Sequence, residues 1–182
     1  AVLEKHGFIK NPTITKKLGV HPDRNIDLDI PASTGSLGQG LPIALGMALS
    51  DKKRSVYCML SDGECAEGSI WEALRVAYEK KVYNLRIIVN ANGWSAYDKV
   101  NLVNLVKRFQ GFGYEVIKVD GHNNKDILNS LKKKAKNKPL IIFGYTSVNQ
   151  FSFLKGLDAH YYVLKEKDFK EGIKGLSWKN KN

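Results

Sequence analysis

The most constraining feature of the sequence is a regular alternation between short apolar runs and longer segments of helical periodicity. The apolar runs are rich in β-branched and aromatic side chains, which favours strands. They occupy residues 55–60, 85–89, 114–119 and 140–145, and a helical segment precedes each of them, at residues 41–49, 69–80, 100–109 and 126–135. This alternation predicts an α/β fold, in which one parallel sheet carries helices on both faces.

Local patterns predict two details of the helical segments. Ser69 and Glu72 stand at the start of the second segment with the spacing of a capping box. Ile127, Leu128 and Leu131 share one face of the last segment and are expected to point inward.

The 182 residues are enough to bury a core, so residues 1–182 are predicted to form a single domain. No apolar stretch approaches the ~18 residues of a membrane span, and no signal peptide is visible. Cys58 and Cys65 have no His or Cys at ligand spacing, which argues against a zinc site and a disulfide framework. A cytoplasmic protein with reduced thiols and no membrane partner is therefore expected.

The chain carries a net charge of +11, which leaves several classes of partner open. The lysines are dispersed, and the densest cluster, at residues 132–136, is typical of a solvated face. No nucleic-acid-binding motif accompanies the charge, so no nucleic-acid partner is expected, although a basic nucleic-acid binder stays as a third class of function. A basic chain also attracts phosphorylated substrates or an acidic protein.

Polar residues follow each predicted strand at the point where it ends. Asp62 follows the first strand, residues 90–93 the second, residues 120–122 the third and residues 146–149 the fourth. In an open parallel sheet, ligands bind outside the carboxyl ends of the strands. The sequence therefore predicts a ligand site at this edge.

Two patterns indicate what such a site binds. Residues 33–40, STGSLGQG, place glycines and hydroxyls before a helix, where the backbone can approach a ligand closely and anions are favoured. Asp62 and Asn92, with a backbone carbonyl, make an all-oxygen set that suits Mg²⁺ or Ca²⁺ rather than zinc. Taken singly, the first pattern also fits a plain loop, and a strand-end Asp is more often a helix cap or turn former.

In combination, these patterns resemble the diphosphate-binding domain of the transketolase family. The family's thiamine-diphosphate motif runs from Gly-Asp-Gly to a later Asn, and here it reads Ser61-Asp62-Gly63 and Asn90-Ala91-Asn92. Further matches cover nearly the whole chain: His21-Pro22, STGSLGQG at 33–40, SDGECAEGSIWEAL at 61–74, FGYEVIKVDGHN at 112–123, KPLIIFGYTS at 138–147 and Ala159-His160-Tyr161. The SDGEC segment is most similar to split transketolases from bacterial surface-sugar pathways.

The resemblance implies thiamine diphosphate and Mg²⁺ (or Ca²⁺) as cofactors. The implied metal ligands, with the ion bridging the two phosphates, are Asp62, Asn92 and the Trp94 carbonyl. Gly63 is implied to give the turn room for the cofactor, and the implied loop on the thiazolium side consists of Ser36, Leu37 and Gly38. His122, in the VDGH turn, is expected to be structural.

The resemblance also implies three catalytic residues, His21, His160 and Glu67. The two histidines match family positions that face the cofactor and substrate, where a neutral imidazole can shuttle protons. Glu67 matches an acid that the family places at the dimer interface near the cofactors. Its alternative role is a favourable charge at a helix N-terminus.

The implied function is that of a diphosphate- and Mg²⁺-binding subunit of a transketolase, which moves a two-carbon ketol unit between sugar phosphates. A separate pyrimidine-binding subunit would supply the acid that activates the cofactor. A homo- or hetero-oligomer is therefore expected, and the isolated chain is expected to be inactive. Exposed hydrophobic side chains around Trp71, Trp94 and Phe151 are the predicted partner surface, although Trp71 itself also fits a packing role.

Three departures from the family pattern keep alternatives open. The domain is expected to be N-terminally short relative to the family, without a front histidine that contacts the cofactor; Ser61 replaces a glycine; and VNQF at 148–151 stands where the family has KGKG. One alternative is another reaction of the same cofactor, such as that of a synthase or decarboxylase. The other is a non-catalytic, truncated transketolase-like protein that binds a partner or cofactor without turnover.

Overall fold

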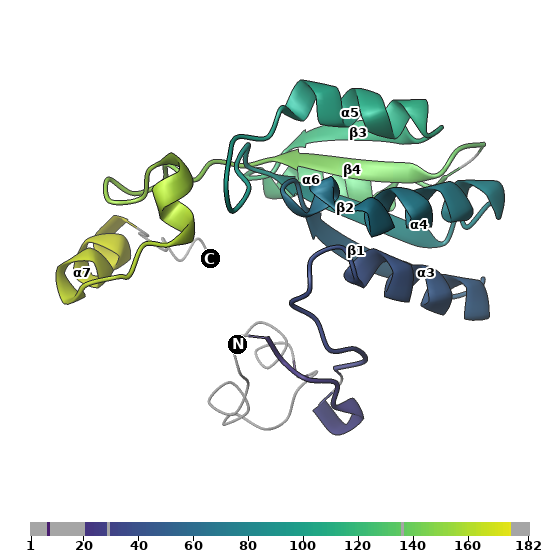
Figure 1. The fold of residues 1–182 in the computed structure, drawn as a ribbon, viewed down its shortest axis with the longest axis horizontal. Coiled ribbons are helices and arrows are strands. Elements are labelled where there is room, and N and C mark those ends of the chain that lie inside the picture. Colours follow the sequence, from purple (N-terminus) through teal and green to yellow (C-terminus); the bar gives the residue numbers. More distant parts are fainter. Residues whose placement is uncertain (1–6, 8–20, 29, 136, 176–182) are drawn as a thin grey trace.

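The computed structural model describes residues 7, 21–28, 30–135 and 137–175. Within these residues, four parallel strands form one sheet in the order β1-β2-β4-β3 (Figure 1). The strands are β1 (Val56–Ser61), β2 (Leu85–Ala91), β3 (Glu115–Asp120) and β4 (Leu140–Tyr145). Their bounds lie within two residues of the predicted ranges, and the predicted α/β class with a parallel sheet is confirmed.

Helices connect and flank the strands. In the described part of the chain they are α3 (Gly40–Ser50), α4 (Gly68–Glu79), α5 (Leu102–Gly111), α6 (Asn124–Lys132) and α7 (Glu166–Gly175), with short 3₁₀ helices η1 (Ile26–Leu28), η2 (Glu64–Ala66) and η3 (Gly156–His160). α6 begins earlier than predicted because the Asn123 side chain accepts hydrogen bonds from the N–H groups of Lys125 and Asp126 and caps the helix. The sequence patterns did not predict α7.

The core lies on the face of the sheet that packs against α3, α4 and α5. Alternate residues of β2 face this side and are at most 2% exposed: Leu85, Ile87, Val89 and Ala91. Trp71 of α4 stacks on Phe109 of α5 with 5.4 Å between ring centroids, and Phe109 meets Phe143 of β4 edge-on. Aromatic contacts therefore join two helices to the middle of the sheet.

The opposite face of the sheet is covered unevenly. The chain reverses its direction across the sheet between β3 and β4, so a right-handed crossover places α6 on this face. α6 packs on β3 and β4, whereas Tyr57 and Met59 of β1 are 57% and 68% exposed. Helices thus lie on both faces as predicted, while the described residues leave the outer side of β1 open.

Two local predictions about the helices are wrong. Leu128 is exposed rather than inward, because the less exposed residues Ile127, Ser130 and Leu131 share the i, i+3, i+4 face of α6 and Leu128 lies beside that face. α4 has no capping box: Glu67 is its N-cap residue, and the Ser69 hydroxyl donates to the Gly38 carbonyl at 2.9 Å. A tertiary hydrogen bond therefore takes the hydroxyl that the local pattern assigned to the helix start.

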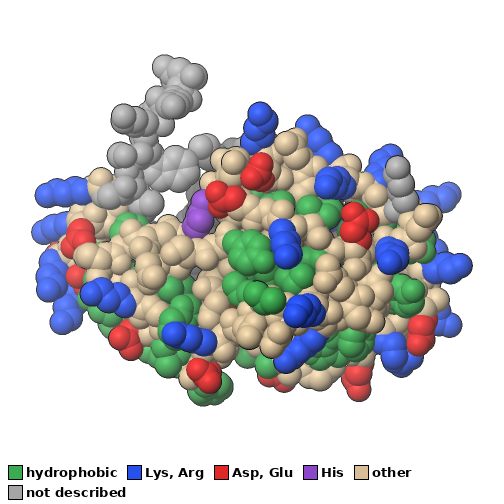
Figure 2. All heavy atoms as spheres, turned by 90° about the horizontal axis from the view of Figure 1, so that it is seen from above, with side chains coloured by type: hydrophobic (Ala, Val, Ile, Leu, Met, Phe, Trp, Pro, Cys, Tyr) green, Lys and Arg blue, Asp and Glu red, His purple; other side chains and the backbone are tan. Residues whose placement is uncertain are grey.

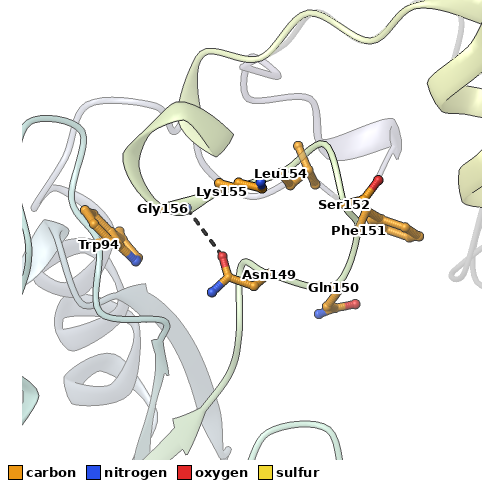
Figure 3. Close-up of a pocket in the computed structure, with 8 residues that line it drawn as sticks. All are labelled: Trp94, Asn149, Gln150, Phe151, Ser152, Leu154, Lys155 and Gly156. Carbon is orange, nitrogen blue, oxygen red and sulfur yellow. Dashed lines mark hydrogen bonds between the residues drawn. The ribbon is translucent and has the colours of Figure 1, made fainter.

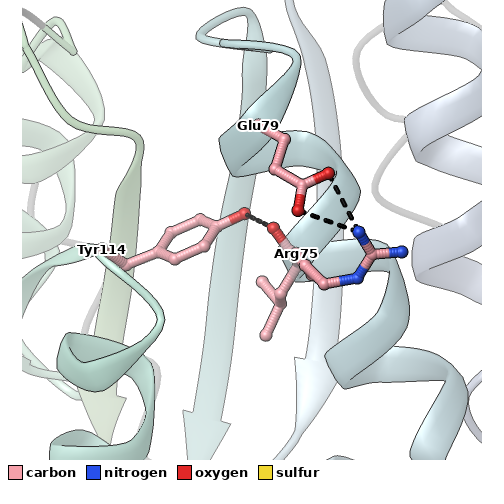
Figure 4. Close-up of polar contacts among 4 residues, drawn as sticks. Arg75, Glu79 and Tyr114 are labelled. Atoms are coloured by element: carbon pink, nitrogen blue, oxygen red, sulfur yellow. Dashed lines mark hydrogen bonds and ion pairs between the residues drawn. The ribbon is translucent and has the colours of Figure 1, made fainter.

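A buried hydrogen bond ties the start of β3 to α4. The Tyr114 hydroxyl donates to the Leu74 carbonyl at 2.9 Å (Figure 4). In the same view, Arg75 and Glu79 form an exposed ion pair of 2.8 Å one turn apart on α4. The buried bond is the one expected to matter for stability, since exposed ion pairs contribute little.

The surface carries dispersed charge. Lys and Arg side chains surround the face seen in Figure 2, with acidic side chains among them, and α6 ends at Lys132, so Lys133 and Lys134 lie beyond the helix. Across the described residues, no helix has the length and apolar character needed to span a membrane.

Candidate functional site

Asp62 lies at the carboxyl end of β1 and is only 2% exposed. Its Oδ1 accepts a hydrogen bond from the Gly63 N–H at 3.0 Å, and its Oδ2 accepts one from the Gly93 N–H at 2.6 Å. Burial raises the pKa of Asp62, and the N–H groups of Gly93 and Gly63 offset part of this rise. The carboxylate therefore joins the turns after two neighbouring strands, as the parallel order of β1 and β2 predicts.

Asn92 and Trp94 belong to the loop that follows β2. The Asn92 Oδ1 accepts a hydrogen bond from the Trp94 N–H at 2.8 Å. A Cβ added at Gly63 would lie 2.9 Å from the Ser95 Cα and 3.6 Å from the Trp94 carbonyl oxygen, so this loop passes directly over the Asp62–Gly63 turn. Among the described residues, no backbone hydrogen bond reaches the Trp94 carbonyl oxygen.

The donor set of these residues fits a magnesium ion. A carboxylate, an amide oxygen and a backbone carbonyl are the hard oxygen donors that Mg²⁺ prefers, and Mg²⁺ usually takes its remaining ligands from phosphate and water. Within the described parts of the chain, no group of three or more His, Cys, Asp or Glu side chains is placed to hold a metal. The predicted set differs from such a group because it contains a single carboxylate, so the ligand roles of Asp62, Asn92 and Trp94 stay predictions.

The glycine-rich turn lies against the N-terminal end of α4. Gly38 is buried with φ +82, and its N–H donates to Glu64 Oε1 at 2.8 Å. A Cβ added at Gly38 would lie 2.7 Å from the Glu67 Cβ, so exposed Glu67 stands beside this turn. Ser36 and Leu37 are exposed and available to a ligand.

The two candidate histidines stand by different loops. His21 is exposed and lies against the glycine-rich turn, because a Cβ added at Gly35 would come 2.5 Å from the His21 ring. His160 ends η3 and is also exposed; the next residue, Tyr161, donates its hydroxyl to the Ala96 carbonyl at 2.6 Å. The described structure records no direct contact between His21 and His160, so their shared role stays a prediction.

A cavity of about 500 Å³ opens between Trp94 and the loop at residues 149–156 (Figure 3). Asn149 Oδ1 accepts a weak hydrogen bond from the Gly156 N–H at 3.4 Å, and Gly156 packs against the Trp94 indole. Phe151 also lines the cavity. Trp94 and Phe151 therefore line one cavity, where both side chains are half-buried rather than exposed as predicted, and their role as a partner surface stays a prediction.

Trp71 does not belong to that surface, which corrects the predicted partner surface. Its ring stacks on Phe109 and lies tilted against Phe112, and its Nε1–H donates to the Cys65 carbonyl at 2.9 Å. Trp71 thus packs between α4 and α5, although the sequence analysis placed it at the partner surface.

Three contacts at this edge involve residues that were not among the predicted site residues. The Thr146 hydroxyl donates to Asn90 Oδ1 at 2.7 Å, and His122 Nε2 accepts a hydrogen bond from the Ser147 N–H at 3.0 Å, a structural role like the one expected for it. Glu64 binds Gly38, as described above. The spacing of Ser61 and Glu64, which fits a capping box, is the sequence signal that points to Glu64.

Comparison with known proteins gives consistent matches. The family model described as transketolase, thiamine diphosphate binding domain, matches residues 10–182. Mouse transketolase is 42% identical over 123 residues, which is 63% of this chain and 20% of that protein. One of the subunits of the apulose-4-phosphate transketolase of Actinobacillus succinogenes is 34% identical over 150 residues, which is 77% of this chain and 54% of the relative.

A solved structure agrees with these matches. Transketolase from Campylobacter jejuni superposes with a TM-score of 0.61 and 31% identity, over 69% of this chain and 22% of its own. The chain thus spans from a fifth to about half of the lengths of the proteins named here.

Proposed function

The chain belongs to the transketolase family, through its thiamine-diphosphate-binding domain, and from this premise we propose that it is the diphosphate- and Mg²⁺-binding subunit of a transketolase. The proposed reaction moves a two-carbon ketol unit between sugar phosphates. The proposed compartment is the cytoplasm, with which two free, buried cysteines, Cys58 and Cys65, are compatible.

The observation that carries the proposal is the junction of three loops at the carboxyl edge of the sheet. The Asp62 carboxylate binds the Gly93 N–H, and the Gly38 N–H binds Glu64, so the turns after β1 and β2 and the glycine-rich turn are held together. Ligands of open parallel sheets bind at this edge, where backbone N–H groups and small residues allow close approach. This arrangement supports an anionic cofactor bound through a cation.

In the proposal, Asp62, Asn92 and the Trp94 carbonyl hold Mg²⁺ (or Ca²⁺), while Gly63 and the turn at 36–38 line the cofactor. Bound thiamine diphosphate supplies the electron sink for breaking and forming carbon–carbon bonds. The residues of this chain hold the diphosphate end and fix its orientation. Holding the diphosphate end matters because a cofactor that can swing loses the geometry that the reaction needs.

His21, His160 and Glu67 have proposed roles at the mouth of the site. A neutral imidazole of His21 or His160 can accept or donate a proton at a substrate hydroxyl or carbonyl. Glu67 is exposed beside Gly38 and is proposed to face the partner subunit.

The proposed partner is a pyrimidine-binding transketolase subunit. The relative from Actinobacillus succinogenes is itself named as one of the subunits of a transketolase, and this chain matches about half of it. The half-buried aromatic side chains at the cavity, Trp94 and Phe151, are the proposed contact surface for the second subunit, since apolar groups rimmed by polar ones mark interfaces.

The test is a ketol-transfer assay with thiamine diphosphate and Mg²⁺, run on the chain alone and with a pyrimidine-binding subunit from the same genome. We expect turnover only with the partner, and a lower kcat in His21→Ala and His160→Ala complexes. Turnover by the chain alone would contradict the split arrangement. Cofactor binding without turnover in any complex would instead favour a non-catalytic protein that binds a partner or cofactor.

A further inference from the structure

Glu64 joins the glycine-rich turn to the turn that carries Asp62. Its Oε1 accepts a hydrogen bond from the Gly38 N–H at 2.8 Å, and its Oε2 accepts one from the Ser61 N–H at 3.4 Å. The Glu64 N–H in turn donates to Ser61 Oγ at 3.0 Å. The reciprocal bonds between Ser61, at the end of β1, and Glu64, at the start of η2, hold the carboxylate in place beside Gly38.

Gly38 is held from its other side as well. The Ser69 hydroxyl donates to the Gly38 carbonyl at 2.9 Å, so both backbone polar groups of Gly38 bind the segment from η2 to α4. A Cβ at this position would lie 2.5 Å from Ser69 Oγ, and φ +82 is unfavourable for any other residue. The turn is therefore packed tightly against α4 and oriented by two specific side chains.

We propose that Glu64 is a positioning residue, a carboxylate latch that holds Ser36, Leu37 and Gly38 in the conformation that receives the cofactor. This inference rests on the proposed function, in which that turn lines bound thiamine diphosphate. Glu64 acts through the turn and not on the reacting atoms, because backbone N–H groups engage both of its carboxylate oxygens.

The chemistry of the latch favours a carboxylate. A hydrogen bond from a backbone N–H to an ionised acceptor is about twice as strong as a neutral one. An amide in its place would offer one acceptor oxygen for two N–H groups. Removal of the side chain leaves Gly38 without this partner, and the free energy of cofactor binding must then offset the ordering of the turn.

The experiment compares Glu64→Ala and Glu64→Gln with the wild-type chain and with Glu72→Ala, which removes an exposed glutamate of α4. Hydrogen–deuterium exchange measures the protection of the amides at 36–40, and calorimetry measures thiamine diphosphate binding with Mg²⁺ present. In Glu64→Ala, we expect exchange at 36–40 and the Kd each to rise roughly tenfold, an effect of ordinary size for one hydrogen bond to a charged group. Glu64→Gln should be intermediate, and Glu72→Ala should match wild type.

The two measurements separate the inference from the function on which it rests. Unchanged exchange at 36–40 in Glu64→Ala overturns the latch, whether or not the wild-type chain binds the cofactor. Faster exchange with an unchanged Kd overturns the positioning role. If the wild-type chain binds no cofactor, alone or with its partner subunit, the proposed function is wrong. The hydrogen–deuterium exchange at residues 36–40 then still decides whether Glu64 holds the turn. If Glu64→Ala folds poorly, Glu64→Gln carries the same comparison.

Discussion

The Asp62 carboxylate accepts a hydrogen bond from the Gly93 N–H at 2.6 Å, and this contact joins the turns that follow β1 and β2. A buried carboxylate is costly unless it is paired, and the pKa of Asp62 is raised by that burial. The two backbone donors relieve only part of this cost. A cation beside Asp62 would stabilise its charged form, which is compatible with the proposed ion-binding role.

Replacement of Asp62 should separate binding from folding. In Asp62→Ala we expect Mg²⁺-dependent thiamine diphosphate binding to be lost, because the diphosphate charge loses a ligand of its counter-ion. The fold should persist with a free energy of unfolding lower by about 1–3 kcal/mol, since the N–H groups of Gly63 and Gly93 lose their acceptor. Calorimetry measures the first effect and urea denaturation the second.

Asp51→Ala is the matched control for this change. Asp51 is an exposed turn aspartate whose Oδ1 accepts from the Lys53 N–H at 2.9 Å, and it precedes β1 at the opposite edge of the sheet. Its replacement should leave cofactor binding unchanged. If Asp62→Ala and Asp51→Ala bound thiamine diphosphate with equal affinity in the presence of Mg²⁺, Asp62 would not be a ligand of the proposed metal ion.

The two cysteines predict a pH dependence. Burial raises the pKa of Cys58 to about 11 and that of Cys65 to about 12, and the charge of Glu64 adds to both rises. A thiol whose pKa is raised by folding contributes stability below its unfolded pKa of about 9, and this contribution is lost as the pH rises toward the folded value. The free energy of unfolding should therefore fall between about pH 9 and 11, less steeply in Cys58→Ala.

The same burial predicts slow thiol chemistry. The thiolate is the reactive form of cysteine, and both thiols are buried as well as protonated near neutral pH. A thiol-reactive dye at pH 8 should label the folded chain slowly and the chain in guanidinium quickly. Rapid labelling of two thiols in the folded state would show that the interior opens readily around β1 and η2.

Tyr114→Phe tests the buried link between β3 and α4. The change removes the hydroxyl that donates to the Leu74 carbonyl, and we expect a loss of about 0.5–1.5 kcal/mol in the free energy of unfolding. Tyr97→Phe is the control, because Tyr97 is 87% exposed. Urea denaturation of both variants measures the difference, and equal stabilities would show that the hydroxyl bond contributes nothing net.

Periodicity was a reliable guide to the strands because their apolar residues are buried on the core side. β4 matches its predicted range at both ends, and its residues Leu140 to Gly144 are all buried. Helix details were less predictable: Ser69 binds Gly38 instead of capping α4, and Leu128 is exposed. Gly38 lies 31 positions before Ser69, so a local pattern around Ser69 carries no information about that contact.

The candidate site was predictable in its location and less so in its connections. Strand ends in a parallel sheet meet at one edge, which is why Asp62 and the 92–93 turn come together. The resemblance supplied residue types, but the contacts of Glu64 with the glycine-rich turn depend on how residue 38 folds back, 26 positions away. That distance in sequence explains why Glu64 had no assigned role.

Gly63→Ala is the final test of the site, because Gly63 separates a packing effect from the loss of a ligand group. A methyl at this position would lie 2.9 Å from the Ser95 Cα, which is backbone and has to shift. The Trp94 carbonyl belongs to the same peptide unit, so a displaced loop moves a proposed metal ligand while Asp62 stays in place. We expect cofactor affinity to fall roughly tenfold, or about 1.4 kcal/mol.

Gly46→Ala provides the opposite control. Gly46 lies inside α3 with nothing within 4 Å of an added Cβ, so alanine should stabilise the helix by about 0.5–1 kcal/mol and leave cofactor binding unchanged. Thermal unfolding measures the stability of the two variants, and calorimetry measures their affinity for the cofactor. If Gly63→Ala bound the cofactor as tightly as Gly46→Ala, the loop that passes over the Asp62 turn would have no part in holding the ion.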